Sequence, residues 1–369
     1  MMSNAQVLAQ QLCRPELLDL QVYESARRLG GAGEIWLNAN ESPFNNSDIV
    51  GINRYPECQP PALIAAYASY AKLAPEQVLT CRGADEAIEL LIRTFCISGQ
   101  DSIGIFSPTY GMYAISAASH NVAVVDTALN EDWSLPVTAT STMQGCKLVF
   151  ICHPNNPTGN LQSRAAIESL VKALPTSLVV IDEAYIEFSA SESVIDLLEQ
   201  YPNLVILRTL SKAFALAGAR CGFCLADPAI LTMMMRIIAP YPVPLPVALL
   251  AQAALTPDGL MQMRTQVQSL NQQRQRLAAA LTECLAVSAV QPGQGNFVLA
   301  TLSSLSLVTA ILQQYGIVAR QYKHPRLAQA IRFSVGHSAD IERVIKALDA
   351  INANLANAND NQNKNKVNS

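Results

Sequence analysis

The stretch Arg208-Thr209-Leu210-Ser211-Lys212-Ala213-Phe214 decides how this chain is interpreted. It follows the apolar run 204–207, which is typical of a buried strand, so one lysine lies just beyond a strand end beside hydroxyl residues. Arg220 follows eight residues after the lysine. A desolvated amine close to positive charge loses basicity and becomes nucleophilic at neutral pH. Lys212 is therefore a candidate to hold an aldehyde as a Schiff base near an anion, and a solvated loop lysine is the alternative.

The composition indicates an ordinary globular protein. The chain has 369 residues, half of them hydrophobic and 15% charged, which is enough for two domains with substantial cores. A net charge of -4 with scattered basic residues predicts no nucleic-acid partner. No apolar run reaches the ~18 residues of a membrane helix, and residues 1–20 lack a signal pattern. We therefore expect a cytoplasmic protein with no membrane partner.

The cysteines and histidines predict neither a redox centre nor a metal site. The nine cysteines have irregular spacings, and several lie in apolar runs, as expected of small core residues in a reducing compartment. Cys221 and Cys224 match C-x-x-C, but they stand in a strand-like run, where residues three apart point to opposite faces. The four histidines show no metal-ligand spacing, so no metal is predicted.

Short apolar strands alternate with helices through the first two thirds of the chain. The strands are predicted at 78–80, 102–106, 122–125, 147–152, 178–181, 204–207 and 221–226. The helices are predicted at 5–13, 60–71, 85–95, from 108 onward, 163–173 and 228–238. Such alternation predicts an α/β fold with a mainly parallel sheet that is covered by helices on both faces.

Polar residues follow three of these strands directly. The strand at 147–152 runs into His153-Pro154-Asn155-Asn156-Pro157-Thr158-Gly159, the strand at 178–181 into Asp182-Glu183-Ala184-Tyr185, and the third into the lysine stretch. Each segment alone also fits an ordinary turn or helix cap. Because the carboxyl ends of parallel strands meet at one edge of a sheet, we expect the three segments to form one site.

A fourth segment suits an anion. Val78-Leu79-Thr80 leads through Arg82-Gly83-Ala84-Asp85-Glu86 into a helix, which is a strand, a tight glycine turn and a helix N-terminus. Backbone N–H groups and the helix dipole at such a point favour a phosphate. The same residues also fit a plain N-cap, with Asp85 as the capping residue.

Four prolines between residues 240 and 246 interrupt the pattern and indicate the main domain boundary. A long helix at 259–284 follows, and then an α+β pattern with strands at 296–300, 317–320 and 331–336 and helices at 305–315 and 340–352. We predict an N-terminal arm that packs with the small domain (1–50), a large domain (51–245), a small domain (246–352) and a disordered tail (353–369).

The motifs in their order resemble those of one enzyme family. Gly83-Ala84-Asp85, Tyr110, Asn156-Pro157-Thr158-Gly159, Asp182 with Tyr185, Ser211-Lys212, Arg220 and Arg332 resemble the pattern of the fold-type I pyridoxal-phosphate aminotransferases, class II, over nearly the whole chain except the tail. The resemblance is greatest to the branch that acts on histidinol phosphate, through residues 25–31, 37–41, 53–60, 82–86, 210–218 and 238–242. His153 departs from the pattern at a position with no catalytic role.

The resemblance implies roles around pyridoxal 5'-phosphate. Lys212 would hold the aldehyde and, once released, move a proton as acid and base. Asp182 would pair with the ring nitrogen, and Asn156 and Tyr185 would bind the 3-hydroxyl. Tyr110 would stack on the ring. The residues that would hold the cofactor phosphate are Ala84, Asp85, Thr209, Ser211 and Arg220.

The resemblance also implies partners. Arg332 would take the α-carboxylate of glutamate and the phosphate of histidinol phosphate in turn, with Asn156, Arg320 and Tyr23 as further substrate contacts. Tyr55 would reach the cofactor phosphate of the neighbouring subunit, which makes the protein a homodimer with shared sites.

The implied activity is amino transfer between L-histidinol phosphate and 2-oxoglutarate in histidine biosynthesis. An aromatic-amino-acid aminotransferase and a phospho-amino-acid decarboxylase of the phosphothreonine type are alternatives within the superfamily. A ligand sensor without turnover is the alternative from another class. Such a sensor would need an added DNA-binding segment, and residues 1–54 contain no basic helix-turn-helix pattern.

Overall fold

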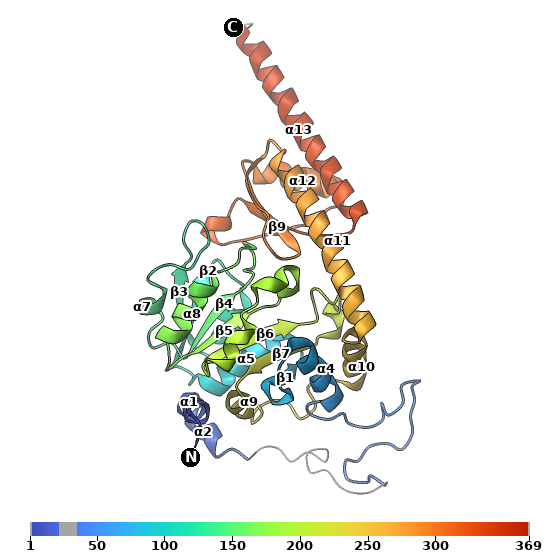
Figure 1. Ribbon diagram of the computed structural model, residues 1–369. Helices are drawn as coiled ribbons and strands as arrows, with labels where there is room; N and C mark the ends of the chain where they lie inside the picture. Colours follow the sequence, from blue (N-terminus) through green and yellow to red (C-terminus); the bar gives the residue numbers. More distant parts are fainter. Residues whose placement is uncertain (1, 22–34, 368–369) are drawn as a thin grey trace.

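The computed structural model describes residues 2–21 and 35–367 and folds them around two β-sheets (Figure 1). The larger sheet has seven strands, and the smaller, antiparallel sheet has four and lies beside the C-terminal helix. This confirms the predicted α/β class, with a large sheet covered by helices and a smaller α+β part.

The large sheet brings its strand ends to one edge. Its strands, in spatial order, are β1 (Val78–Cys81), β7 (Gly222–Ala226), β6 (Leu204–Thr209), β5 (Leu178–Asp182), β4 (Leu148–Cys152), β2 (Ser102–Ser107) and β3 (Ala123–Ala128). Strand β7 is antiparallel to both of its neighbours, and the remaining pairs are parallel. The edge at which the parallel strands end is therefore also the edge at which β7 begins.

Helices cover both faces of this sheet. One face carries α4 (Pro61–Ala71), α7 (Ala139–Thr142), α8 (Arg164–Ala173), η2 (Ile186–Glu192), η3 (Ile195–Glu199), α10 (Leu245–Ala254) and the first part of α11 (Pro257–Thr282). The other face carries α1 (Asn4–Leu12), α2 (Pro15–Leu18), α5 (Ala84–Phe95), α6 (Met112–Ser119) and α9 (Pro228–Met234). Short 3-10 turns lie at η1 (Pro75–Gln77), η4 (Ala217–Ala219) and η5 (Pro325–Leu327).

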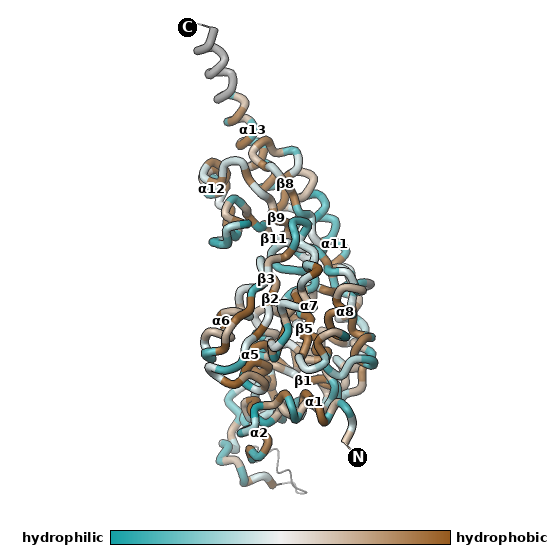
Figure 2. The backbone as a smooth tube through the Cα atoms, turned by 90° about the vertical axis from the view of Figure 1, so that its left-hand side faces the viewer, coloured by the Kyte–Doolittle hydropathy of each residue, from teal (hydrophilic) through white to brown (hydrophobic). Residues whose placement is uncertain are grey.

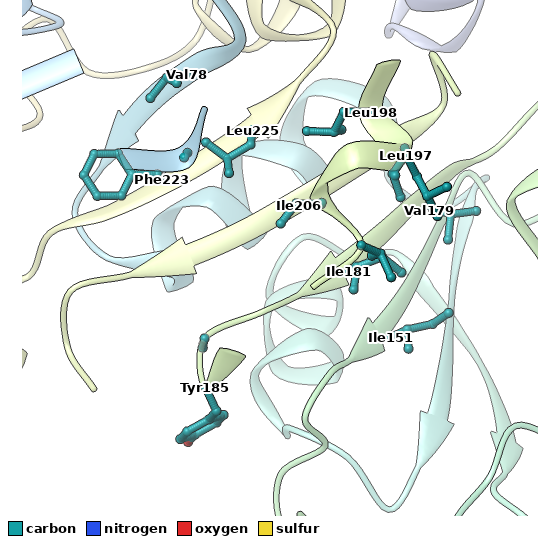
Figure 3. Close-up of a cluster of buried hydrophobic side chains, with 14 of the residues drawn as sticks. Val78, Ile151, Val179, Ile181, Tyr185, Leu197, Leu198, Ile206, Phe223 and Leu225 are labelled. Carbon is teal, nitrogen blue, oxygen red and sulfur yellow. The ribbon is translucent and has the colours of Figure 1, made fainter. Parts of the chain in front are cut away.

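Alternate residues of each strand serve the two faces, because successive side chains of a strand point to opposite sides. Figure 3 shows one face, where Ile151, Ile181 and Ile206 of neighbouring strands lie with Leu197 of η3 in one apolar cluster. Tyr185 lies beyond the end of its strand at the border of this cluster. The core therefore extends directly to the edge where the polar segments gather.

The small sheet has one core face and one face turned toward the large domain. Its strands, in order, are β10 (Arg320–Gln321), β11 (Ala330–Ser334), β9 (Phe297–Leu302) and β8 (Val287–Gln291). Helices α12 (Leu305–Gln314) and α13 (Ser338–Val367) pack with α11 on the face that carries Ile331 and Phe333. Helix α11 runs along both parts of the molecule, and α13 projects beyond them (Figures 1 and 2). Arg332 belongs to the opposite face, because it alternates with those two core residues.

The start of the chain lies elsewhere than predicted. Helix α1 packs on α9, with Ala9 and Leu12 in the core of the large sheet's second face. Arg236 donates to the carbonyl oxygens of Leu17 and Leu18, which ties the next residues to the same domain. The prediction that the N-terminal arm packs with the small domain is therefore wrong for residues 4–18, whose apolar stripe is buried against α9.

Three further elements differ from the sequence expectation. Helix α10 was not predicted, because prolines precede it; Pro246 lies in its first turn, where a missing N–H costs nothing. Strand β8 was missed because its side chains are mostly half-buried or exposed and show little alternation. Helix α13 continues to Val367, through most of the range 353–369 that was predicted to be disordered.

Candidate active site

A cavity of about 520 Å³ opens at the edge where the parallel strands of the large sheet end. It is lined by ten of the residues singled out from the sequence, and also by Cys152, Ala184 and Ala217. The ten are Ala84, Asp85, Tyr110, Asn156, Asp182, Tyr185, Thr209, Ser211, Lys212 and Arg220. They come from six separate segments of the chain, which the fold brings together around one cavity.

Two glycines make one wall of the cavity possible. Gly83 has φ +82°, and a Cβ there would lie 2.7 Å from Nη2 of Arg220. A Cβ on Gly222 would lie 2.5 Å from the backbone carbon of Gly83. Strand β7 therefore passes against the start of α5 at a distance that only glycine allows. The first turn of α5 points its backbone N–H groups into the cavity's anion-binding end.

Arg220 is the cation of this wall. It has φ 53° and ψ 55°, a left-handed conformation that is rare for a residue with a side chain and that clusters at functional sites. Its Nη2 donates to Oδ2 of Asp85 at 3.1 Å and its Nη1 to Oγ of Ser211 at 3.3 Å. Tyr110 Oη donates to the other oxygen of Asp85 at 2.9 Å. Thr209 Oγ1 donates to Ser211 Oγ at 2.9 Å. The two hydroxyl groups, the Arg220 guanidinium and the N-terminus of α5 therefore lie together at one end of the cavity.

Asp182 lies at the floor of the cavity and is buried, at 2% exposure. Tyr113 Oη donates to its Oδ2 at 2.7 Å, and the backbone N–H of Ala184 donates to its Oδ1 at 3.1 Å. Burial raises the pKa of Asp182 to about 6, and the two hydrogen bonds oppose that rise. The carboxyl group is held in place by neutral donors, and its ionised form would gain from a cationic partner.

Lys212 lines the same cavity as Asp182, and its pKa depends on burial and on the charges around it. Burial lowers its pKa, and so do the positive charges of Arg332 and Arg220, while Asp85 and Asp182 oppose them. Its Nζ lies 5.4 Å from the centre of the Tyr185 ring. Within the described part of the chain it has no carboxylate partner closer than 4.0 Å. The amine is therefore more easily deprotonated than an exposed lysine.

Asn156 links the cavity to the small domain. Its Nδ2 donates to Tyr185 Oη at 3.1 Å, and its Oδ1 accepts a hydrogen bond from Nη1 of Arg332. Arg332 lies over the ring of Phe297, with 5.2 Å from its Cζ to the ring centre. Strand β11 thus delivers a guanidinium to the mouth of a cavity that belongs to the large domain.

Arg332, at the cavity mouth, is not among the residues that line the cavity, and neither are Arg320 and Tyr55. Arg320 is exposed on β10, directly opposite Arg332 on β11. Tyr55 is 48% exposed and stacks on Tyr241 at 4.4 Å between ring centres, beside a separate hollow next to Pro244. Tyr23 lies outside the described residues.

The sequence argument missed two contributions to the site. Tyr113, on α6, holds Asp182, yet nothing in its spacing distinguishes it from a core aromatic residue. Arg208 and Glu183, on the far side of the same strand ends, form a buried ion pair with 2.7 Å between Nη2 and Oε2. Each of these two residues adjoins a cavity residue, so the pair fixes the ends of β5 and β6 relative to each other.

The family model described as aminotransferase class I and II matches residues 27–348 of this chain. A protein of Shewanella oneidensis named histidinol-phosphate aminotransferase is 56% identical over 351 residues, which is 93% of this chain and 90% of that protein. A protein of Shewanella amazonensis with the same name is 57% identical over 352 residues, 94% of this chain and 96% of its own.

A solved structure shares the fold. It is described as histidinol-phosphate aminotransferase from Sinorhizobium meliloti in complex with pyridoxal-5'-phosphate, and it matches with a TM-score of 0.74 at 24% identity. The match covers 86% of this chain and 90% of that one.

None of the helices within residues 2–21 and 35–367 is both long and apolar enough to cross a membrane. The same described residues hold no group of three or more His, Cys, Asp or Glu side chains that could bind a metal ion.

Proposed function

Because this chain belongs to the class I and II aminotransferase family, we propose that it moves the amino group of L-histidinol phosphate to 2-oxoglutarate with pyridoxal 5'-phosphate as cofactor. The products are imidazole-acetol phosphate and L-glutamate, in a reversible step of histidine biosynthesis. The observation that carries the proposal is the shared name of relatives 56% and 57% identical over nearly the whole chain, together with a lysine of lowered pKa in the same cavity as a buried carboxylate.

The residues of the cavity fit this cofactor. The cavity combines apolar lining with a few polar and charged side chains, as small-molecule sites do. When bound, the cofactor supplies an aldehyde that links to an amine and a protonated ring that withdraws electrons from it. Asp182 suits the ring nitrogen, because its donors among the described residues are neutral and its carboxylate is buried. Its negative charge would keep the ring nitrogen of the bound cofactor protonated.

The opposite end of the cavity suits the cofactor phosphate. The backbone N–H groups of Ala84 and Asp85 begin a helix, where an anion is stabilised. Thr209 and Ser211 supply hydroxyl donors, and Arg220 supplies a guanidinium. Asp85 already pairs with Arg220, so it orients that guanidinium instead of binding the phosphate through its side chain.

Between the two ends, side chains hold the ring and move the proton. Asn156 and Tyr185 are hydrogen-bonded to each other and can both reach one ring oxygen. Tyr110 supplies an aromatic face that Asp85 orients through the phenol hydroxyl. Lys212 binds the aldehyde as a neutral amine, which its lowered pKa favours. Once displaced by the substrate amine, the same group would take the proton from the substrate Cα and return it to the cofactor carbon that carried the aldehyde.

Arg332 serves both substrates in turn. It can bind the α-carboxylate of glutamate with a two-pronged hydrogen bond and the phosphate of histidinol phosphate in the other half-reaction. Its Nη1 contact with Asn156 places it at the cavity mouth, and its Nε is buried with no hydrogen-bond partner among the described residues. One basic pocket thus suits a ping-pong reaction in which the two anions never bind together.

We also propose a homodimer with Tyr55 contributed across the interface. Tyr55 does not line the cavity of its own chain. The segment around it exposes large apolar side chains, as does α10 beside it, and monomers rarely expose such groups together. These side chains are Ile35 (83%), Leu37 (89%), Phe44 (74%), Val50 (90%), Leu249 (46%) and Leu250 (52%). A second subunit over this face would bury them and bring Tyr55 toward the other site.

A cytoplasmic location is proposed from the cysteines. All nine are buried and none forms a disulfide. Burial raises the pKa of the Cys221 thiol to about 12, and it raises the pKa of Cys224 as well. Thiols in this state are unreactive core residues, which suits a reducing compartment.

Amino transfer can be measured directly. The purified protein is supplied with pyridoxal phosphate, L-histidinol phosphate and 2-oxoglutarate, and glutamate formation is quantified. We expect glutamate to form in proportion to the histidinol phosphate consumed. Faster reaction with phenylalanine or tyrosine would keep the reaction class and overturn the substrate. Release of carbon dioxide from O-phospho-L-threonine would indicate a decarboxylase, and no transfer to any oxo acid would indicate a sensor.

A further inference from the structure

Two arginines of the small sheet face each other without an intervening carboxylate. Arg320 on β10 is paired directly with Arg332 on β11, and directly paired residues of antiparallel strands place their side chains on the same face. Like charges at this position are destabilising. Within residues 2–21 and 35–367, neither guanidinium has an ion pair closer than 4.0 Å. This face of the sheet is therefore arranged to receive an anion.

Tyr322 follows β10 directly and lies two residues after Arg320, the spacing at which side chains along a strand share a face. Its ring centre is 5.9 Å from Cζ of Arg320 and 6.0 Å from Cζ of Arg332. Its hydroxyl oxygen is buried and has no hydrogen-bond partner among the described residues, as is also true of Nε of Arg332. Buried polar atoms without partners are rare in proteins, and these two belong to neighbouring side chains on one face, so this face suits a ligand that accepts hydrogen bonds.

The ring of Tyr322 is held from behind. It packs with Leu299, Leu327 and Ala330 of the small domain and with Trp133 of the large domain. A phenol fixed between two domains has little freedom to turn its hydroxyl away from the two guanidiniums. The hydroxyl is therefore a positioned donor and not a solvated one.

The two substrates of the proposed reaction differ in the charge and in the number of oxygens that this face must bind. A carboxylate carries one charge and two oxygens, which a single arginine satisfies. A phosphate monoester carries a charge of about −1.5 to −2 at pH 7 and three terminal oxygens. The third oxygen needs a further hydrogen-bond donor, and the additional charge needs a further cation. The Tyr322 hydroxyl and the Arg320 guanidinium can supply them.

We propose that Tyr322 is a specificity-determining residue, whose hydroxyl donates to the phosphate of histidinol phosphate beside Arg332 and Arg320 and which the carboxylate of glutamate does not use. This inference rests on the proposed function. It assigns the discrimination between a phosphate and a carboxylate to one phenol hydroxyl.

The test is the Tyr322→Phe variant, which removes one hydroxyl and keeps the ring. Single-turnover half-reactions of the cofactor-loaded protein are followed by absorbance with L-histidinol phosphate, L-histidinol and L-glutamate. The second-order rate constant for L-histidinol phosphate should fall about tenfold or more relative to that for glutamate, as for a lost hydrogen bond to a charged group. The ratio between L-histidinol, which lacks the phosphate, and glutamate should stay constant.

Tyr315→Phe is the matched control, because Tyr315 packs in the core on the other face of the small sheet. It should leave all three ratios as in the wild type. An equal fall for all three substrates in Tyr322→Phe would show a merely structural role and overturn the inference, as would no fall at all. A wild-type protein that reacts with glutamate but not with L-histidinol phosphate would instead overturn the proposed function.

Discussion

Tyr113 and Asp182 are joined by a hydrogen bond of 2.7 Å from the phenol Oη to Oδ2. Tyr113 is fully buried on α6 and stacks on Phe150 of β4 at 4.8 Å between ring centres, so its hydroxyl has a fixed position. The bond stabilises the ionised carboxylate and thereby opposes the burial that raises the pKa of Asp182. A core aromatic residue thus keeps the carboxylate at the cavity floor charged.

We predict that Tyr113→Phe shifts the acid limb of the pH–rate profile to higher pH. Loss of the donor removes a stabilising bond from the ionised form, so the pKa of Asp182 rises further above about 6. The activity at neutral pH should fall about tenfold, since a hydrogen bond to a charged group contributes about 1.5–3 kcal/mol. Tyr201→Phe, which removes a hydroxyl bonded to Glu168 at the surface, should leave the profile as it is. An unshifted acid limb in Tyr113→Phe would contradict the assignment.

Gly83→Ala should weaken cofactor binding. The residue has φ +82°, and the added Cβ would lie 2.7 Å from Nη2 of Arg220, which must then move away from the phosphate end of the cavity. We expect the Kd for pyridoxal phosphate to rise about tenfold, measured by fluorescence titration. Gly145→Ala is the matched control, because Gly145 has φ +86° and nothing within 4 Å of the added atom. Both variants should lose stability from the left-handed backbone, but only Gly83→Ala should lose cofactor affinity.

The buried pair of Arg208 and Glu183 should contribute strongly to stability. The side chains are 7% and 0% exposed, and Glu183 also accepts hydrogen bonds from Ser193 Oγ and Val194 N. Glu183→Gln leaves a buried guanidinium without its counter-charge, which costs about 3–5 kcal/mol of unfolding free energy. Asp196→Asn breaks the exposed pair with Arg164 and should cost less than about 1 kcal/mol. Urea unfolding of both variants measures the difference, and equal losses would refute the ranking.

Glu187 should make stability fall as the pH rises. Burial raises the pKa of its carboxyl from 4.5 to about 7, against the opposing charge of Arg208, while Glu183 raises it further. The folded state therefore holds a proton that the unfolded chain releases between pH 4.5 and about 7, and stability present below this window is lost across it. The loss is roughly 3 kcal/mol, at 1.36 kcal/mol for each unit of pKa.

The variant Glu187→Gln isolates this effect, because Asp182 contributes with the same sign and is unchanged. The amide mimics the protonated carboxyl, so the variant should match the wild type near pH 4 and exceed its unfolding free energy at pH 8. Chemical unfolding at several pH values provides the measurement. A wild-type stability that rises with pH relative to the variant would show that Glu187 is ionised in the folded protein at low pH.

The site residues at strand ends were predictable because they follow apolar runs directly in the sequence. Asn156, Asp182 and Lys212 each follow a buried strand within a few residues, and parallel strands deliver their ends to one edge. The motif order then pointed to the family, and relatives above 50% identity bear that out. Local sequence was sufficient for these residues because their position depends on strand ends alone.

Other features depend on packing that no local pattern encodes. Tyr113 reaches Asp182 only because α6 lies across β4 and β5, and Tyr322 meets Arg332 only through the register of β10 with β11. The direction of β7 follows from its short connection to β6, with Arg220 in a left-handed turn. The arm at residues 4–18 carries apolar side chains that could cover either domain, so its place on α9 is set by tertiary fit.

The most direct test of the central claim is the absorbance spectrum of the purified protein with pyridoxal phosphate, recorded before and after L-histidinol phosphate is added alone. We predict a visible band from the cofactor bound to Lys212, which bleaches to the amine form of the cofactor when the substrate is added. The variant Lys212→Ala should show no such substrate-driven bleaching. A wild-type protein that forms no visible band with added pyridoxal phosphate would contradict the account and leave Lys212 as an ordinary buried loop lysine.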